Sequence, residues 1–246
     1  CTIHHIDDDK FDNIALKDFL DRDKYVDLYH VISKKTLSQV KKITDKPIVT
    51  IPFWINQNIW FEINNKTEIY KDLNLNPNNF YVGSFQRDTE GHDLVSPKLS
   101  KGPDQFIDIV KSLNKKKSNL EVILSGKRRN YVVKELEDVN IRYKYFEMAS
   151  FKKLNKLYNI LDLYVVSSRY EGGPQSILEC AITKTPIIST DVGIASEILS
   201  QKSIFNMTNF ESATVDTEFA FNKVQKFKIP NGFNEFNTAL GKLNEN

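Results

Sequence analysis

The chain has 246 residues, enough for one large domain or two small ones, and its 40% hydrophobic content is ordinary for a globular protein. A formal net charge of +2 is too small to argue for nucleic acid, so we expect no nucleic-acid partner. The sequence contains no run of 18 apolar residues and therefore offers no candidate for a membrane-spanning helix.

Strand-like and helix-like patterns alternate from the start of the chain. In the first part we predict strands at 2–5, 28–33 and 47–51, and helices at 14–20, 34–43 and 66–73. Ser33 is a suitable N-cap for the helix that follows it. A polar linker at 74–79 then leads into a denser series of elements.

The denser series predicts a doubly wound sheet. We expect strands at 80–85, 120–124, 141–145, 161–166 and 186–189, and helices at 103–113, 130–138, 151–158, 175–184 and 195–199. Alternating elements of these lengths indicate a parallel sheet with helices on both faces, and right-handed crossovers then give doubly wound topology. The tail at 207–246 is mostly helical in pattern.

Ligands of open parallel sheets bind at the carboxyl ends of the strands. Gly83 ends a predicted strand and would let the backbone approach a ligand. Arg87 offers a planar fork for phosphate oxygens, and Lys101 lies just before the helix that Pro103 opens. A helix start beside a cation suits an anion, although both cations could equally be solvated loop residues.

A second helix start, at 172–176, is another candidate anion site. Pro174 has no N–H, so Gly173, Gln175 and Ser176 are the useful donors. The alternative is a simple Gly-Pro helix start. The fingerprints of dinucleotide-binding and P-loop proteins are absent from the sequence.

Two glutamates, Glu171 and Glu179, flank this helix start with seven residues between them. Glu179 lies in a helix that is apolar almost all round, where a charge is costly unless it is paired or bound to a polar group. At ~1.5 Å per residue it lies about 8 Å along the axis from the helix start. The two carboxylates therefore suit different parts of one long ligand better than a single hydrolysed bond. A sugar at Glu171, phosphates at the helix start and a ribose at Glu179 fit this spacing.

These residues carry a resemblance to a known family. Gly83, Lys101-Gly102-Pro103, the glutamate pair and Thr190-Asp191-Val192-Gly193 with Glu197 together resemble family 4 of the retaining nucleotide-sugar glycosyltransferases. That family has the GT-B fold, in which two Rossmann-like domains face each other across a cleft. The resemblance implies an α/β fold with a Rossmann-like doubly wound parallel sheet, the GT-B C-terminal domain, and a partial second Rossmann-like domain.

The resemblance also implies a division into three parts. Residues 1–76 would be a truncated remnant of the N-terminal acceptor-side domain, because the family's first domain is longer. Residues 77–206 would be the domain that binds the nucleotide-sugar donor. Residues 207–246 would be a C-terminal helical tail that packs back toward the N-terminal part.

The resemblance also implies roles for the residues that match the family's motifs. Glu171, at the transferred sugar, and His4, with His5 as its rival, would be the catalytic residues, and Glu179 would hold the ribose hydroxyls. Arg87 and Lys101 would neutralise the diphosphate. The full implied donor-binding set is Gly83, Arg87, Lys101, Arg128, Gly172, Gly173, Gln175, Ser176, Ile177 and Glu179, and the nucleobase would be bordered by Tyr145, Phe146, Glu147 and Met148. In this chain a long insertion separates Gly83 from Lys101, unlike the family pattern.

The implied activity is transfer of a sugar from a nucleotide-diphosphate sugar, such as a UDP-sugar, to an acceptor hydroxyl with retention of anomeric configuration. The acceptor would be a glycan, a lipid or another hydroxyl compound, as in cell-surface polysaccharide biosynthesis. The nucleotide-sugar is a substrate, and neither cofactor nor metal is expected. The alternatives are a non-catalytic nucleotide-sugar binding module or fragment, and a GT-B epimerase.

Cysteine and lysine placement bear on location. Cys180 lies in the apolar helix, so we expect no disulfide with Cys1 and a reducing, cytoplasmic compartment. Basic clusters at 115–117, 127–129 and 152–156 are either solvated surface or a source of weak peripheral attraction to the anionic inner face of a membrane.

Overall fold

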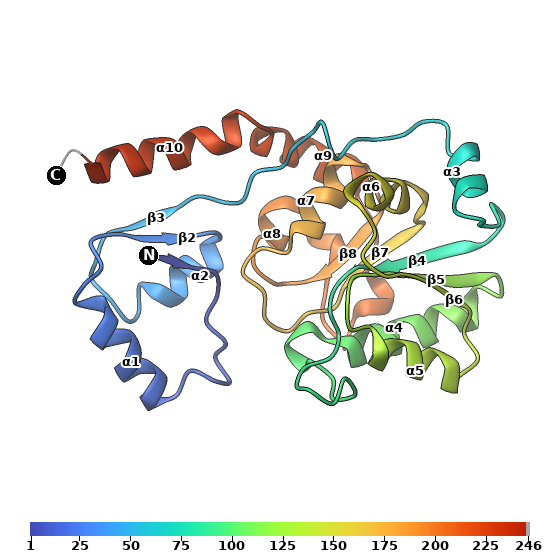
Figure 1. The fold of residues 1–246 in the computed structure, drawn as a ribbon, viewed down its shortest axis with the longest axis horizontal. Helices are drawn as coiled ribbons and strands as arrows, with labels where there is room; N and C mark the ends of the chain where they lie inside the picture. The colour runs from blue at the N-terminus through green and yellow to red at the C-terminus, as the bar shows by residue number, and fades with distance from the viewer. Residues whose placement is uncertain (245–246) are drawn as a thin grey trace.

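The computed structural model describes residues 1–244, and within them the strands form two parallel sheets (Figure 1). The smaller sheet has the order β1-β2-β3, and the larger has the order β6-β5-β4-β7-β8-β9. Every pair of neighbouring strands runs parallel. The predicted α/β class with a doubly wound parallel sheet is confirmed.

The smaller sheet is formed by β1 (Thr2–Ile3), β2 (Tyr29–Val31) and β3 (Ile48–Thr50), with helices α1 (Asn13–Asp23) and α2 (Lys34–Val40) between them. The predicted N-cap of α2 is confirmed, because the Ser33 hydroxyl accepts a hydrogen bond from the N–H of Thr36 at 3.1 Å. Strand β1 is shorter than predicted. Its partner β2 ends two residues before this cap, so His4 and His5 continue beyond the sheet.

The larger sheet contains β4 (Phe80–Ser84), β5 (Leu120–Ser125), β6 (Tyr143–Phe146), β7 (Leu163–Val166), β8 (Ile187–Thr190) and β9 (Ile204–Phe205). The chain runs outward from β4 to β6 and then returns to the opposite side of β4 with β7. The direction of winding therefore reverses between β4 and β7. In open α/β sheets this switch point is where ligands bind.

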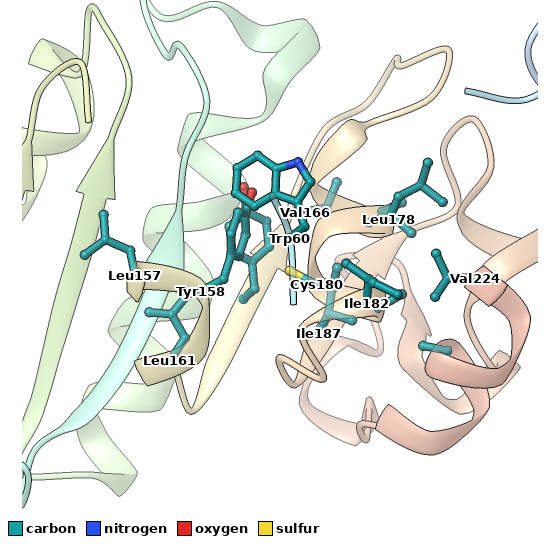
Figure 2. Close-up of a cluster of buried hydrophobic side chains, with 14 of the residues drawn as sticks. Trp60, Leu157, Tyr158, Leu161, Val166, Leu178, Cys180, Ile182, Ile187 and Val224 are labelled. Atoms are coloured by element: carbon teal, nitrogen blue, oxygen red, sulfur yellow. The ribbon is translucent and has the colours of Figure 1, made fainter. Parts of the chain in front are cut away.

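Helices cover both faces of the larger sheet (Figure 1). One face carries α4 (Pro103–Lys116) and α5 (Asn130–Asp138), and the other carries α6 (Phe151–Ile160), α7 (Gln175–Ile182), α8 (Ala195–Ile198) and α9 (Thr217–Val224). Figure 2 shows the hydrophobic core between the sheet and the helices of the second face. There Trp60, from the segment before α3, packs on Tyr158 of α6 at a ring-centroid distance of 5.7 Å. Burial on both faces explains why strands such as β7 read as continuous apolar runs.

Two connections join the sheets. Residues 51–66 lead to α3 (Thr67–Asp72), and α10 (Asn231–Asn244) returns from the larger sheet to the smaller one (Figure 1). The ring of Trp54 lies 4.9 Å from that of Phe233, and His30 lies 5.4 Å from Phe236. The C-terminal helix therefore packs against both the connection and the smaller sheet.

Predicted and observed boundaries differ by a few residues in most elements. The helix predicted to reach residue 43 ends at Val40, and the strand predicted from 161 begins at Leu163. Strand β9 was not predicted, because two residues carry too little periodicity to recognise. In the part of the chain that the structure describes, no helix is both long and apolar enough to cross a bilayer.

Candidate active site

A cavity of about 490 Å³ opens at the switch point of the larger sheet. Its walls come from the loops that follow β4, β5, β6 and β7, together with α6 and the start of α7. The lining residues are Phe85, Gln86, Lys101, Ser125, Gly126, Met148, Ala149, Leu154, Tyr158, Tyr164, Glu171, Gly173, Pro174, Gln175, Ser176 and Glu179. Both glutamates of the predicted pair therefore face the same cavity.

An ion pair between the Lys101 ammonium and Glu171 Oε1 forms one end of the cavity. Both side chains are largely shielded, with 25% and 13% of their surfaces exposed, so the pair is screened less by solvent than a surface pair. Gly102 makes this possible, because its backbone has φ 59° and a Cβ there would lie 1.8 Å from the Ser167 carbonyl oxygen. The loop that carries Lys101 can approach β7 only with glycine at this position.

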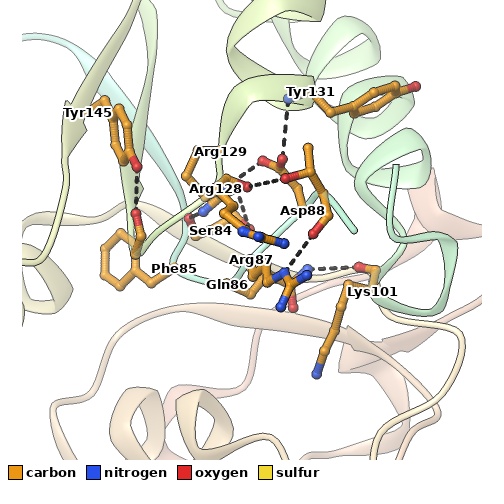
Figure 3. A network of polar contacts seen from close by, with 12 residues as sticks. Ser84, Phe85, Gln86, Arg87, Asp88, Lys101, Arg128, Arg129, Tyr131 and Tyr145 are labelled. Carbon is orange, nitrogen blue, oxygen red and sulfur yellow. Dashed lines mark hydrogen bonds and ion pairs between the residues drawn. The ribbon is translucent and has the colours of Figure 1, made fainter. Parts of the chain in front are cut away.

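Gln86 and Ser168 form hydrogen bonds to the two residues of this ion pair. The Gln86 amide donates to the Lys101 carbonyl at 2.8 Å, as Figure 3 shows. Ser168 Oγ lies 3.1 Å from Glu171 Oε1 and 3.3 Å from Gln86 Oε1. The two charged side chains are thus fixed through neutral polar groups from the ends of β4 and β7.

Glu179 forms the other end of the cavity. The Tyr158 hydroxyl donates to Glu179 Oε2 at 2.6 Å. Burial raises the pKa of Glu179 to about 7, and the hydrogen bond from Tyr158 opposes that rise. Beside it, the hydroxyl of Tyr164 accepts a hydrogen bond from the N–H of Phe85 at 3.0 Å. The carboxylate is therefore partnered by one phenol, in a site where carrying charge is costly.

Glu179 should make the stability of the protein depend on pH. Its pKa is 4.5 before burial and about 7 in the fold, so the folded chain holds the proton more tightly between these values. The unfolding free energy should then fall by about 3 kcal/mol as pH rises from 4.5 to above 7. Glu179→Gln should remove this part of the slope in urea titrations at pH 5 and pH 8. The exposed control Glu147→Gln should keep the slope, and an unchanged slope in Glu179→Gln would refute the assignment.

Helix α7 begins between the two glutamates. Gly173, Gln175 and Ser176 line the cavity, as an anion site at the helix start requires. Ile177 does not serve as expected, because its N–H donates to the Pro174 carbonyl at 3.0 Å and its side chain is buried in the core. The usable N–H groups are therefore those that precede Ile177.

Gly172 lies where the two sheets' loops meet. A Cβ at this position would lie 2.0 Å from the carbonyl oxygen of His4, so only glycine allows the contact. We expect Gly172→Ala to push residue 4 away from the α7 loop and to loosen the two parts of the chain. Small-angle X-ray scattering should report a larger radius of gyration. The control Gly241→Ala, which meets nothing within 4 Å, should leave the radius unchanged, and an unchanged radius in Gly172→Ala would contradict the expectation.

Five predicted donor-binding residues do not line the cavity: Gly172 and Ile177, described above, and Gly83, Arg87 and Arg128. Arg87 donates to the Thr89 carbonyl at 2.6 Å, and Arg128 donates to the Gly91 carbonyl at 3.0 Å, so both guanidinium groups serve the insertion that follows β4. Gly83 lies within β4, and a Cβ there would meet Leu161 at 2.3 Å. Its missing side chain makes room for core packing and not for a ligand.

The sequence analysis did not single out Arg129, which is 1% exposed. Its guanidinium donates to Asp88 at 2.8 Å, to the Ser125 carbonyl at 3.0 Å and to the Ser84 carbonyl (Figure 3). Burial raises the pKa of Asp88, and Arg129 opposes that rise. Arg129 therefore ties the carboxyl ends of β4 and β5 together behind the cavity.

Among the four residues predicted to border a base, only Met148 lines the cavity. The Tyr145 hydroxyl is engaged with the Gly126 carbonyl at 2.7 Å, and Lys153 lies 5.5 Å above the Phe146 ring. Glu147 is exposed outside the cavity. This wall also contains residues that the sequence analysis missed, Gln86, Ser125, Gly126, Ala149 and Leu154. The signal for Gln86, Ser125 and Gly126 was their position directly after a strand.

The two histidines approach the site from the smaller sheet in different ways. The His4 ring lies 5.7 Å from that of Phe53, whereas His5 lies near Glu171 and Lys101. Burial lowers the pKa of His5, and Lys101 acts in the same direction while Glu171 opposes it. Neighbours in an extended segment point to opposite sides, which explains why only one of them reaches Glu171. His5, and not the preferred His4, is the histidine beside that carboxylate.

A metal site has no support in the described residues. Within 1–244, no three His, Cys, Asp or Glu side chains lie close enough to share a metal ion.

Part of the chain is similar in sequence to known glycosyl transferases. Residues 96–214 match the family model for glycosyl transferases group 1. The lipopolysaccharide core biosynthesis mannosyltransferase LpsB of Rhizobium meliloti (strain 1021) is 26% identical over 142 residues, which cover 55% of this chain and 38% of the relative. The chain thus spans well under half the length of this curated relative.

Solved structures share the fold. The structure of HepE from Anabaena in complex with UDP and glucose matches with a TM-score of 0.78 and 16% identity, over 98% of this chain and 71% of HepE. Sucrose-phosphate synthase from Thermosynechococcus elongatus matches with a TM-score of 0.75 and 14% identity, over 99% of this chain and 66% of the synthase. The predicted Rossmann-like GT-B fold is therefore confirmed. The family match covers residues 96–214, and the solved structures, at 16% and 14% identity, show the fold.

Proposed function

We propose that the protein binds a nucleoside-diphosphate sugar in the large cavity and transfers the sugar to an acceptor hydroxyl with retention of anomeric configuration. One observation carries the proposal. A single cavity at the switch point has a carboxylate–ammonium pair at one end, a buried carboxylate at the other and a helix start between them. This order matches the sugar, diphosphate and ribose of one extended ligand.

The diphosphate would lie at the start of α7. The Lys101 ammonium and the backbone N–H groups of Gln175 and Ser176 would neutralise it and stabilise the charge that grows as it leaves. Glu179 would accept hydrogen bonds from the ribose hydroxyls, and the base would lie toward Met148. Glu171 would contact the transferred sugar. When the donor binds, the ion pair between Glu171 and Lys101 would either break or open to include the diphosphate.

The division of the chain follows from these roles. Residues 77–206 would bind the donor, residues 1–76 would contribute the acceptor side with His5 or His4, and residues 207–246 would link the two parts. We propose that no metal or cofactor is needed, and that Lys101 and the N–H groups at the start of α7 stabilise the diphosphate instead. Transfer in the presence of EDTA would test this point.

The biological setting is proposed from the relatives. LpsB is named for lipopolysaccharide core biosynthesis, and HepE is crystallised with UDP and glucose. We propose a UDP-sugar donor and a glycan, lipid or other hydroxyl acceptor in cell-surface polysaccharide biosynthesis. This would take place in the cytoplasm at the inner face of the membrane, with weak peripheral attraction through the basic clusters.

Glu171→Gln tests the catalytic part of the proposal. Glutamine keeps the shape and a hydrogen bond to Ser168 but loses the charge, so nucleotide affinity should change less than about threefold while transfer should fall more than about a hundredfold, the scale set by losing a charged group at the reacting centre. Product formation and nucleotide affinity should be measured in parallel. Retention should be read from the anomeric NMR signals of the product. Unchanged transfer in Glu171→Gln would refute the assigned role.

Two other functions use the same site. A binding module without activity would bind nucleotides and give no product with any acceptor. A GT-B epimerase would convert the donor sugar when no acceptor is present. Product analysis with and without acceptor separates these three outcomes.

A further inference from the structure

The segment that carries Lys101 is hydrogen-bonded to the segment that leads into Glu171. Each backbone carbonyl of residues 99–102 accepts a hydrogen bond from residues 167–170, over distances between 2.8 and 3.4 Å. The two segments come from different loops, one before α4 and the other after β7. The position of Lys101 relative to Glu171 is therefore set by how these segments pair.

One side chain, Arg169, bonds the Lys101 segment on both sides of the lysine. Its guanidinium donates to the Leu99 carbonyl at 2.8 Å, two residues before Lys101. It also donates to both carboxylate oxygens of Asp104, at 2.8 and 2.6 Å, three residues after Lys101. A guanidinium holds such partners in one geometry because its N–H groups form a rigid planar fork. Arg169 therefore fixes the backbone that carries Lys101.

Arg169 takes no direct part in the large cavity. It does not line that cavity, and its charge is paired with Asp104. The two side chains are 35% and 33% exposed, and an ion pair with this much exposure adds little to the stability of the fold. An effect of Arg169 on the reaction would therefore pass through the position of Lys101.

The neighbours of Arg169 in the chain hold the other member of the ion pair. Ser168, which precedes it, donates to Glu171 Oε1 at 3.1 Å, and Glu171 itself follows two residues later. One short loop thus positions both charges at this end of the cavity. The position matters because a displacement of about 1 Å at a reacting centre can slow a reaction about a hundredfold.

We propose that Arg169 is a positioning residue, which holds the Lys101 ammonium in the place where it meets Glu171 and the leaving diphosphate. The catalytic consequence rests on the proposed function, in which Lys101 stabilises that diphosphate. The inference adds a residue outside the cavity on which the rate of transfer depends.

Two substitutions of Arg169 in the whole chain test the effect on transfer. Arg169→Met keeps much of the length of the side chain and removes its hydrogen bonds, so transfer at saturating donor should fall more than about tenfold, within the range that misplacement produces. Arg169→Lys keeps the charge but not the fork, so it should restore little of the rate. Affinity for UDP should change less than transfer does, because Lys101 is still present. The control Arg22→Met removes an exposed ion pair with Asp18 and should leave the rate unchanged.

Lysine labelling reports the position of Lys101 without any turnover. Brief treatment of the chain with acetic anhydride, followed by mass spectrometry, gives the acetylation rate of each lysine. Lys101 should react slowly in the natural chain, because its side chain is 25% exposed and paired with Glu171. In Arg169→Met it should react more than about threefold faster, since a loosened segment opens more often. Lys127, which is exposed, should keep its rate.

Three results would overturn the proposal: unchanged transfer in Arg169→Met, unchanged labelling of Lys101 in that variant, or full activity in Arg169→Lys. Should Arg169→Met fail to fold, Asp104→Asn weakens the same ion pair from its other side. It should then give slower transfer and faster Lys101 labelling, and natural rates of both would equally overturn the proposal. No product from the natural chain with any acceptor would instead contradict the proposed function, and faster Lys101 labelling in Arg169→Met would still show that Arg169 holds the lysine in place.

Discussion

Glu179→Ala should weaken nucleoside-diphosphate binding by about ten- to a hundredfold. A hydrogen bond to a charged group is worth about 1.5–3 kcal/mol, and the variant removes the carboxylate that would hold the ribose. The effect should appear as a higher dissociation constant in calorimetry at pH 8, above the pKa of about 7 that burial gives this group.

The control for this variant is Tyr158→Phe. It removes the hydroxyl that donates to Glu179 at 2.6 Å but keeps the ring and the carboxylate. Nucleotide affinity should change only severalfold, because the carboxylate remains in place. Equal affinity in Glu179→Ala and the natural chain would show that the ribose does not lie at this end of the cavity.

Arg129→Met should be the most destabilising of the single substitutions considered. It leaves Asp88, which is 1% exposed, without its cation, and breaking a buried pair in this way costs about 3–5 kcal/mol. Urea denaturation should report that loss in unfolding free energy. The adjacent control Arg128→Met removes one bond to the Gly91 carbonyl and should cost less than about 1 kcal/mol.

A double variant separates the lost charge from lost packing. Arg129→Met combined with Asp88→Leu removes both charges and should recover most of the stability, since apolar replacements of buried pairs are often neutral. If Arg129→Met and Arg128→Met were equally stable, the buried pair would not tie β4 to β5 as described.

The sequence predicted the larger sheet well because its strands are buried on both faces. Continuous apolar runs such as 163–166 leave little choice of element, and the intervening helices are long enough to show their own period. Short elements were less predictable. Strand β1 has only two residues that pair with β2. Its length depends on where β2 ends, and the sequence around β1 gives no information about that end.

The site was predictable where geometry follows from local structure. Lys101 precedes one helix, and Glu171 and Glu179 lie on either side of the start of another, so the carboxyl edge of the sheet brings them to one cavity. The misplaced residues depend on folding of the insertion after β4. Carbonyl groups of that loop accept hydrogen bonds from Arg87 and Arg128. Nothing in the sequence shows that Arg129, and not its neighbour Arg128, is the buried arginine.

Tyr158 illustrates another limit. Its helix reads as core, and it is buried, yet its hydroxyl supplies the hydrogen bond to Glu179 from 21 positions away. Pairings at such separation are set by how helices α6 and α7 pack, so the sequence alone could name the carboxylate but not its partner.

The most direct test of the account is a calorimetric titration of the natural chain with UDP, GDP and ADP. The account predicts one binding site for at least one of these nucleotides, with affinity that falls on Lys101→Ala as well as on Glu179→Ala, because the two residues lie at opposite ends of one cavity. Binding of none of the three, or binding that neither substitution weakens, would contradict the claim that this cavity holds a nucleotide-sugar.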